Sequence, residues 1–358
     1  MNDVVIEELI LPDNLDGPHG DDFRELMAVR NLVESETVGT DALSPTPESL
    51  LPHFVPNPQR HRRHFVVREG GRMVARGIMG WLTAEGAPSV SIGADVLPSH
   101  RRRGIGSQLF ALMEGLAADL GRPVLQSSAI HTSSPDGERI VSSTGFGDIP
   151  ADDPGAQFLL HHGYTLEMIA RISSLDLTTA AASLEELRRA AAARAGDDYR
   201  VVSWIGRTPE EWLEQKAALA TAMSTDEPSG GLATVADVWD ADRVREHDDR
   251  QEGTGRTIYT SAVEHVPSRT LAGHTELGRL DGADKPAVQE DTLVLRAHRG
   301  HRLGMLLKGA NAQFMLAHAP DTPLVTTFNK EDNEPMLRVN VEMGFVPIGA
   351  EGEWQKRV

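Results

Sequence analysis

The hydrophobic pattern of the chain switches between the period of a strand and the period of a helix, and each switch marks an element. Alternating or continuous apolar runs predict the strands of the first half at 4–9, 65–68, 73–81, 89–96, 123–125 and 168–172. Apolar residues three and four positions apart predict helices at 21–35 and 107–120. Gly70 and Gly71 give a hairpin signal between two of these strands. The pattern therefore predicts a mixed α/β sheet with helices packed on it.

Polar stretches separate these elements. Segments 39–58 and 132–154 are rich in Pro, Gly, Ser, Thr and Asp, which predicts irregular structure in both. Segment 183–194 is rich in Ala and Arg and predicts a helix with a mostly solvated surface. We interpret this helix as the connector between two domains, because the strand pattern begins again directly after it.

The second half repeats the order of the first. Its apolar runs predict strands at 199–202, 257–263, 270–280, 292–295 and 323–328, and its helical patterns lie at 208–223, 237–250, 306–317 and 335–343. A repeated order of elements in 358 residues predicts two tandem domains of one fold. We place them at 1–178 and 198–358, joined by a helical linker at 179–197.

One segment joins a predicted strand to a predicted helix and carries candidate chemistry. It reads Val-Leu-Pro-Ser-His-Arg-Arg-Arg-Gly-Ile-Gly-Ser from Val96 to Ser107. Gly104 and Gly106 leave backbone N–H groups open to an anion, since no Cβ stands in the way. Three arginines at 101–103 add guanidinium groups that suit phosphate oxygens. The segment lacks the third glycine of a Rossmann site and the Gly-Lys-Ser/Thr ending of a P-loop.

Arg101, Gly104 and Gly106, preceded by Val-x-Pro at the strand end, resemble the pyrophosphate loop of the GCN5-related N-acetyltransferase (GNAT) superfamily. The resemblance implies two tandem GNAT acyl-CoA N-acyltransferase domains of α/β (mixed α+β sheet) class, with acetyl-CoA as cosubstrate. It implies that this cosubstrate is bound by Val96, Arg101, Arg102, Arg103, Gly104, Ile105, Gly106, Ser107 and, in the second half, Asn333. The alternative interpretation is a strand-to-helix turn that binds nothing.

A second copy of the loop lies at 294–304, in the same register. Arg302 stands where the first copy has its first glycine, so this side chain has to turn away if the second loop is to bind a phosphate. Asn333 belongs to a segment that resembles the other cofactor motif of the superfamily. Many members carry a tyrosine as general acid where this chain has Asn340 in the second half and Leu159 in the first. We therefore expect the first half to hold acetyl-CoA.

Composition narrows the choice of partners. The chain has 53 acidic and 35 basic residues and a formal charge of −18, which argues against a nucleic-acid or membrane surface and favours a cationic partner such as an amine. It has no cysteine, which excludes disulfides and thiolate chemistry, and its 14 histidines form no spaced set of metal ligands. With no leader pattern and no apolar run of ~20 residues, we expect a soluble cytoplasmic protein, monomeric or homodimeric.

Acetyl transfer needs a neutral amine, so a carboxylate or a water chain has to take its proton. Glu276 and Asp291 are our candidate catalytic residues, because both lie on or beside strands near the second loop. Glu290, and Asp95 before the first loop, are the other carboxylates with a comparable place, and each of the four can equally be a surface group.

The tandem arrangement is similar to that of the mycothiol synthase family within the superfamily. We therefore predict a GNAT-type acetyltransferase that moves an acetyl group from acetyl-CoA to the amine of a small molecule. Two alternatives remain. The first is a non-catalytic acyl-CoA-binding or sensing protein, which the missing tyrosine favours, and the second is a protein lysine acetyltransferase.

Overall fold

The computed structural model describes residues 5–41, 43–54, 59–84, 86–132, 136–226, 230–233, 237–252 and 254–358. The first half contains β1 (Ile6–Glu8), α1 (Gly20–Val38), α2 (Pro47–Phe54), β2 (Arg60–Glu69), β3 (Arg72–Leu82), β4 (Ser89–Val96), α3 (Ile105–Asp119), β5 (Val124–His131), β6 (Arg139–Val141), β7 (Asp148–Pro150), α4 (Pro154–His161) and β8 (Thr165–Asp176). The second half contains α5 (Leu177–Ala195), β9 (Tyr199–Ile205), α6 (Leu213–Asp226), α7 (Ala241–Gln251), β10 (Arg256–His265), β11 (Thr270–Leu280), β12 (Ala287–Val294), α8 (Leu303–His318), β13 (Leu324–Lys330), α9 (Glu334–Met343) and β14 (Val346–Arg357).

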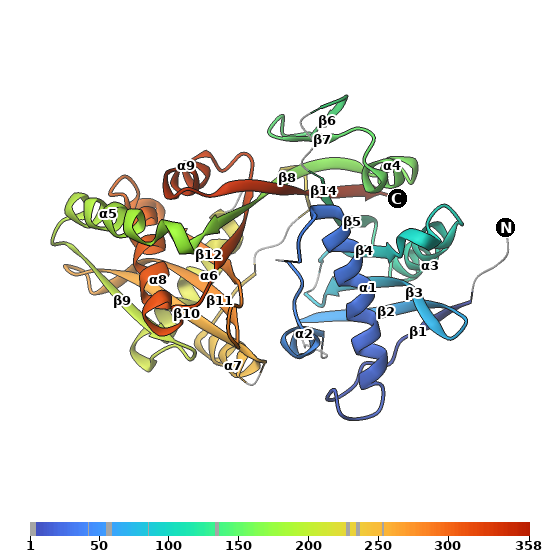
Figure 1. The fold of residues 1–358 in the computed structure, drawn as a ribbon, viewed down its shortest axis with the longest axis horizontal. Helices are drawn as coiled ribbons and strands as arrows, with labels where there is room; N and C mark the ends of the chain where they lie inside the picture. Colours follow the sequence, from blue (N-terminus) through green and yellow to red (C-terminus); the bar gives the residue numbers. More distant parts are fainter. Residues whose placement is uncertain are drawn as a thin grey trace.

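Within the described residues, twelve strands form one sheet in the order β1-β2-β3-β4-β5-β14-β8-β13-β12-β11-β10-β9, and β6 pairs with β7 in a separate hairpin. Neighbouring strands of the large sheet are antiparallel except in the pairs β4/β5 and β12/β13. These parallel pairs occupy equivalent places in the two halves, so the repeat predicted from the sequence is confirmed at the level of element order. The sheet runs through both halves (Figure 1).

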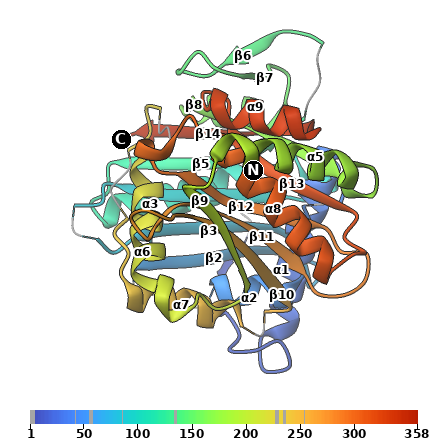
Figure 2. The ribbon, with the colours of Figure 1, turned by 90° about the vertical axis from the view of Figure 1, so that its left-hand side faces the viewer.

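The two strands at the centre of the sheet each border the opposite half. β14, which belongs to the second half, pairs with β5 of the first along Val124–His131 (Figure 2). β8, which belongs to the first half, pairs with β13 of the second along Leu324–Lys330. Each half therefore obtains a neighbouring strand from the other. The domain boundaries at 178 and 198 stay a prediction, and strand pairing crosses them in both directions.

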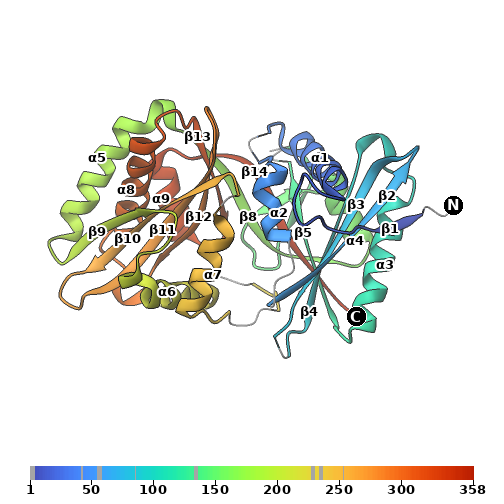
Figure 3. The same cartoon turned by 90° about the horizontal axis from the view of Figure 1, so that it is seen from below.

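Helices cover both faces of the sheet in each half. On β2, Phe65 and Val67 belong to the core under α3, whereas Val66 belongs to the core under α1. On β10, Val263 packs with α5 and α8, whereas Ala262 packs with α6. Successive residues of a strand point to opposite faces, which explains why adjacent residues such as Val66 and Val67, or Ala262 and Val263, are both apolar. Between the halves, α2 approaches α7 (Figure 3).

Two segments predicted to be irregular contain regular structure. Segment 39–58 contains α2, whose Leu51 is buried against α1, so the prediction is wrong there. Segment 132–154 contains the β6/β7 hairpin. Some residues of the predicted segments lie outside the described residues, namely 4, 42, 55–58 and 133–135. In both segments, buried apolar residues contact elements far away in the sequence: Leu51 packs on α1, and Ile149 of β7 is buried in the core under α3. A local window of sequence does not contain these contacts.

The helix predicted to be a solvated connector is α5, and it is part of the second core. Leu184 and Ala191 are fully buried on it, and the helix packs along α8. At Gly309 on α8, an added Cβ would lie 3.1 Å from Cβ of Arg188, so glycine permits this close approach. The predicted solvated surface is found outside this face, and the structure adds that leucines and small alanines of one face bury the helix against the second core.

Candidate active site

The loop between β4 and α3 presents unpaired backbone donors. In the described part of the chain, none of the backbone N–H groups from Arg102 to Ser107 donates a hydrogen bond to a protein acceptor. Arg102 and Gly104 have φ of 62° and 83°, a left-handed conformation that turns the chain into the helix. Such a row of amides at a helix N-terminus suits an anion. A Cβ at Gly106 would lie 3.3 Å from the Phe158 ring, so helix packing also requires glycine there.

The three arginines of the loop have different environments. Arg101 pairs with Glu36 at 2.8 Å and Arg103 with Glu69 at 3.3 Å. Among the described side chains, no partner holds the guanidinium of Arg102. Arg101 and Arg102 line the large cavity described next, whereas Arg103 does not. The loop therefore brings one uncommitted guanidinium to the cavity.

Behind the loop, β4 and β5 separate. Their parallel pairing is confined to Ser89–Ser91 with Val124–Gln126. From Ser91 to Val96, β4 then runs about 17 Å without this neighbour, at ~3.3 Å per residue. A cavity of about 1270 Å³ opens here. Its walls include β4, β5, α1, α2, the loop and the start of α4.

The second half closes the same cavity. Its contributions are Arg256, Gly278, Leu280, Pro286, Val288 and Phe328. Glu351 of β14 also lines the wall, through the strand that pairs with β5. These contributions are mainly apolar, whereas the first half supplies most of the charged groups. The site therefore belongs to both halves.

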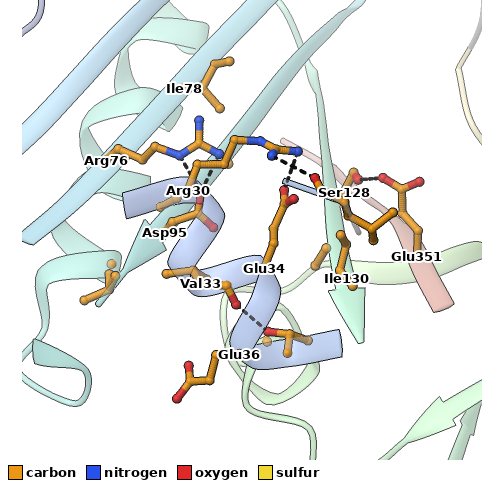
Figure 4. A pocket seen from close by; sticks show the side chains of 18 of the residues that line it. Arg30, Val33, Glu34, Glu36, Arg76, Ile78, Asp95, Ser128, Ile130 and Glu351 are labelled. Atoms are coloured by element: carbon orange, nitrogen blue, oxygen red, sulfur yellow. Dashed lines mark hydrogen bonds and ion pairs between the residues drawn. The ribbon is translucent and has the colours of Figure 1, made fainter. Parts of the chain in front are cut away.

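Three polar contacts lie on the cavity wall, and one of them joins the two halves (Figure 4). Arg30 and Glu34 of α1 form an ion pair of 2.8 Å. Arg76 and Asp95 pair at 2.6 Å, and Ser128 donates to Glu351. Burial raises the pKa of Glu34 to about 7, and the charge of Arg30 only partly offsets this effect.

Several predicted residues gather at this site. The cavity is lined by seven of the residues predicted to bind the cosubstrate: Val96, Arg101, Arg102, Gly104, Ile105, Gly106 and Ser107. Sequence reasoning missed Arg30, Glu34 and Glu351. For Arg30 and Glu34 a signal existed, because charged residues on or beside the apolar face of a predicted helix need a reason to be there. For Glu351 there was none, since only the sheet places β14 beside β5.

The structure does not bring the predicted catalytic pair to the cavity. Glu276 lies on β11 in an ion pair with Lys216 and accepts a hydrogen bond of 3.0 Å from Thr260. Burial alone would raise its pKa, but Lys216 and His274 together hold that pKa at about 2. Asp291 lies on an exposed stretch of β12. Neither carboxylate lines the large cavity.

Asn333 also lies away from the cavity. It caps the N-terminus of α9, where its side chain accepts from the amide of Met336 at 3.4 Å. Asn340, at the position where many superfamily members have tyrosine, accepts a hydrogen bond of 2.5 Å from Lys308 and donates to Asn329. Its amide group is therefore engaged by protein partners.

The second loop has the same backbone as the first. Gly300 and Arg302 have φ of 89° and 58°, and they correspond to Arg102 and Gly104 of the first loop. Both positions are left-handed in both loops, although glycine occupies the second of them in the first loop and the first of them in the second loop. The side chain of Arg302 turns aside to pair with Glu342. The backbone N–H groups of 300–305 donate to no acceptor among the described residues.

The two halves differ in the room beside the strands. By the register of the repeat, Glu276 corresponds to Ile78, which lines the large cavity. In the second half the Lys216–Glu276 pair fills this space, and a hollow of about 20 Å³ is left beside Glu276.

Among the described residues, no group of His, Asp or Glu is arranged to hold a metal ion. The described helices include none with the length and apolar composition of a membrane span.

The fold and the site indicate the class of protein. A mixed sheet whose two parallel strands separate behind a loop of unpaired backbone N–H groups is typical of the acyl-CoA N-acyltransferase fold. No protein-family model and no curated protein sequence matches the chain. Among solved structures, a tandem GNAT protein from the clavulanic acid biosynthesis pathway matches with a TM-score of 0.73 and 27% identity, over 99% of this chain and 98% of that one. The chain therefore has the fold and the tandem architecture of a GNAT protein, as the sequence resemblance predicted.

More distant structures share the fold. A GCN5-related N-acetyltransferase from Sphaerobacter thermophilus matches with a TM-score of 0.58 and 12% identity, over 99% of this chain and 95% of that one. The N-myristoyltransferase of Saccharomyces cerevisiae, solved with bound myristoyl-CoA, matches with a TM-score of 0.55 and 13% identity, over 98% and 79%. These likenesses confirm the predicted fold class.

Proposed function

We propose that the protein is an N-acetyltransferase that moves the acetyl group of acetyl-CoA to the amine of a small molecule. The observation that carries this proposal is the unpaired row of amides from Arg102 to Ser107 at the wall of a large cavity. These donors, with the guanidinium of Arg102, suit the pyrophosphate of the donor. The gap between β4 and β5 has room for its extended arm.

The first half is the proposed site of binding and chemistry. Both loops offer free amides, but the first opens onto the cavity of about 1270 Å³, whereas the hollow beside Glu276 in the second half holds about 20 Å³. The walls from both halves favour an acceptor small enough to be surrounded. The excess of acidic residues in the chain favours a cationic acceptor, such as a protonated amine.

Calorimetric titration with acetyl-CoA tests the binding site. We expect one cosubstrate per chain, and loss of binding in Gly104→Glu, because a carboxylate would face the pyrophosphate. Gly104→Ala is the matched control, since it adds the strain of a side chain at φ 83° without the charge. Arg302→Glu, at the equivalent position of the second loop, should leave binding unchanged. Loss with Arg302→Glu and retention with Gly104→Glu would contradict the assignment.

A non-catalytic acyl-CoA-binding protein is the second candidate. It is favoured because none of the three tyrosines of the chain lines the described cavity, so no tyrosine is in place as general acid. Thiol release from acetyl-CoA in the presence of amines separates the two candidates. The absence of cysteine means that the protein itself contributes no thiol signal. Binding without amine-dependent thiol release would support the second candidate, and faster release with a lysine peptide than with small amines would support a protein acceptor.

A further inference from the structure

Glu34 occupies an unusual place for a carboxylate. It lies on α1, faces the cavity, and is 16% exposed. One carboxylate oxygen pairs with Arg30 at 2.8 Å. The other oxygen, Oε2, is buried and has no hydrogen-bond partner among the described residues. A buried carboxylate oxygen without a partner is costly, which is why such groups gather at functional sites.

We propose that Glu34 is the catalytic residue that takes the proton from the acceptor amine. This assignment rests on the proposed function. The ammonium group of the acceptor gives one proton to the carboxylate of Glu34, and the neutral nitrogen forms the N–C bond with the acetyl carbonyl. The C–S bond breaks, its electron pair goes to sulfur, and a second proton from nitrogen ends on that sulfur. Glu34 then returns its proton to solvent, so the products are one amide, one thiol and one proton.

The neighbouring carboxylates are less suited to this step. Asp95 receives both Nε and Nη2 of Arg76 on its oxygen Oδ2, each at 2.6 Å, and these two charge-assisted contacts stabilise it as the ionised partner of the arginine. Glu351 accepts from the hydroxyl of Ser128. Of these three carboxylates, Glu34 is the one with a buried oxygen that lacks a hydrogen-bond partner in the described part of the chain, and a proton bound there would relieve that cost.

The charges that face Glu34 come from four elements. Arg30 lies on the same helix, Arg76 on β3, Asp95 on β4 and Glu351 on β14. The two arginines favour the ionised carboxylate, while burial and the two acids oppose it, and the net effect is a pKa of about 7. Glu34 can therefore both accept and release a proton near neutral pH.

The test is steady-state kinetics of Glu34→Gln on the amine that the wild type acetylates fastest in a panel of amino acids, diamines, polyamines and arylalkylamines. We expect kcat to fall about 10²-fold or more, with the Kd of acetyl-CoA changed less than twofold. The wild-type kcat should rise through pH 7, and this step should be absent in the variant. An amine that is already neutral at pH 7 should lose less rate than an ammonium. Glu264→Gln is the matched control, because it removes a buried carboxylate paired with an arginine, on β10 and outside the cavity.

Two further variants keep the test informative if Glu34→Gln fails to fold. Glu34→Asp keeps the charge and withdraws it by one methylene, so it should lose part of kcat and keep the pH step. Arg30→Gln with Glu34→Gln removes both charges of the pair and should show the full loss of kcat. If the wild type acetylates amines and Glu34→Gln retains the same kcat and pH profile, the assignment of Glu34 is overturned while the proposed function stands. If the wild type neither binds acetyl-CoA nor acetylates, the proposed function fails, and the assignment fails with it.

Discussion

Trp354 tests whether the two halves depend on each other for stability. It lies on β14, in the second half of the chain, yet it is fully buried in the core of the first half. Its indole N–H donates to Nε2 of His131 at 3.3 Å, and Nδ1 of the same ring lies 2.8 Å from Asp153, the N-cap of α4. Replacing Trp354 with alanine should therefore destabilise the first half.

The magnitude follows from the burial. A buried tryptophan removes ~150–250 Å² from water, which corresponds to about 4–6 kcal/mol at ~25 cal/mol per Å². Large-to-small substitutions of buried aromatic residues typically cost about 3–5 kcal/mol. The lost hydrogen bond leaves a buried nitrogen of His131 unpaired, which adds about 1–3 kcal/mol. We expect the free energy of unfolding to fall by about 4 kcal/mol or more for Trp354→Ala.

Urea unfolding followed by circular dichroism measures this change, and hydrogen exchange locates it. Amides of β5 and α3 in the first half should lose protection first. Val358→Ala is the control, since this side chain is 64% exposed and should change stability by less than about 0.5 kcal/mol. A loss below ~1 kcal/mol for Trp354→Ala, or a loss of protection confined to the second half, would refute the reasoning.

Three other predictions concern the second half. Burial lowers the pKa of His274 to about 4, so the unfolded chain binds more protons than the folded one between pH 4 and 6.5, and the free energy of unfolding falls as pH falls through this window. The free energies of unfolding from urea titrations at pH 7 and pH 4 should differ by about 3 kcal/mol less in His274→Leu than in the wild type, and an equal difference would contradict this. Burial also lowers the pKa of Lys308 to about 7, so stability should rise between pH 7 and pH 10 by several kcal/mol, on the order of 3–5, and Lys308→Met should lack that rise in the same assay. Gly309→Val should push α5 away from α8 at Arg188 and lower the thermal midpoint of unfolding. Gly115→Val on α3 is the control, because a Cβ there meets no atom within 4 Å and only the helix propensity of valine acts on the midpoint. Equal losses in the two variants would contradict the close packing of α5 on α8.

Much of the local structure could be predicted from the sequence because its causes are local. The hairpin at Gly70 and Gly71 follows from two residues that both adopt positive φ. The loop at 101–107 was predicted from glycines between a strand and a helix, and its backbone has the expected turn. In the second loop the backbone conformation is the same although the residue differs, because Arg302 adopts the left-handed region that Gly104 adopts in the first loop.

The candidate site was predicted only in part. The residues that bind through the backbone were found, since the loop that carries them is continuous in sequence. The carboxylates were not, because Glu34 comes from α1 and Glu351 from β14, and nothing in their local sequence shows that they face one cavity. Glu276 was chosen for its place near the second loop, where the structure has an ion pair with Lys216.

By itself, the sequence determined the repeated order of elements, the phosphate-type loop and its degenerate copy, because these depend on hydrophobic period and on residues a few positions apart. Only the tertiary structure decided that β8 and β14 each border the opposite half, that one face of α5 is buried, and that one cavity takes walls from both halves. The reason is that strand neighbours and cavity walls are set by contacts between segments far apart in the chain. Their free energy depends on the burial of whole faces, which no local window of sequence contains.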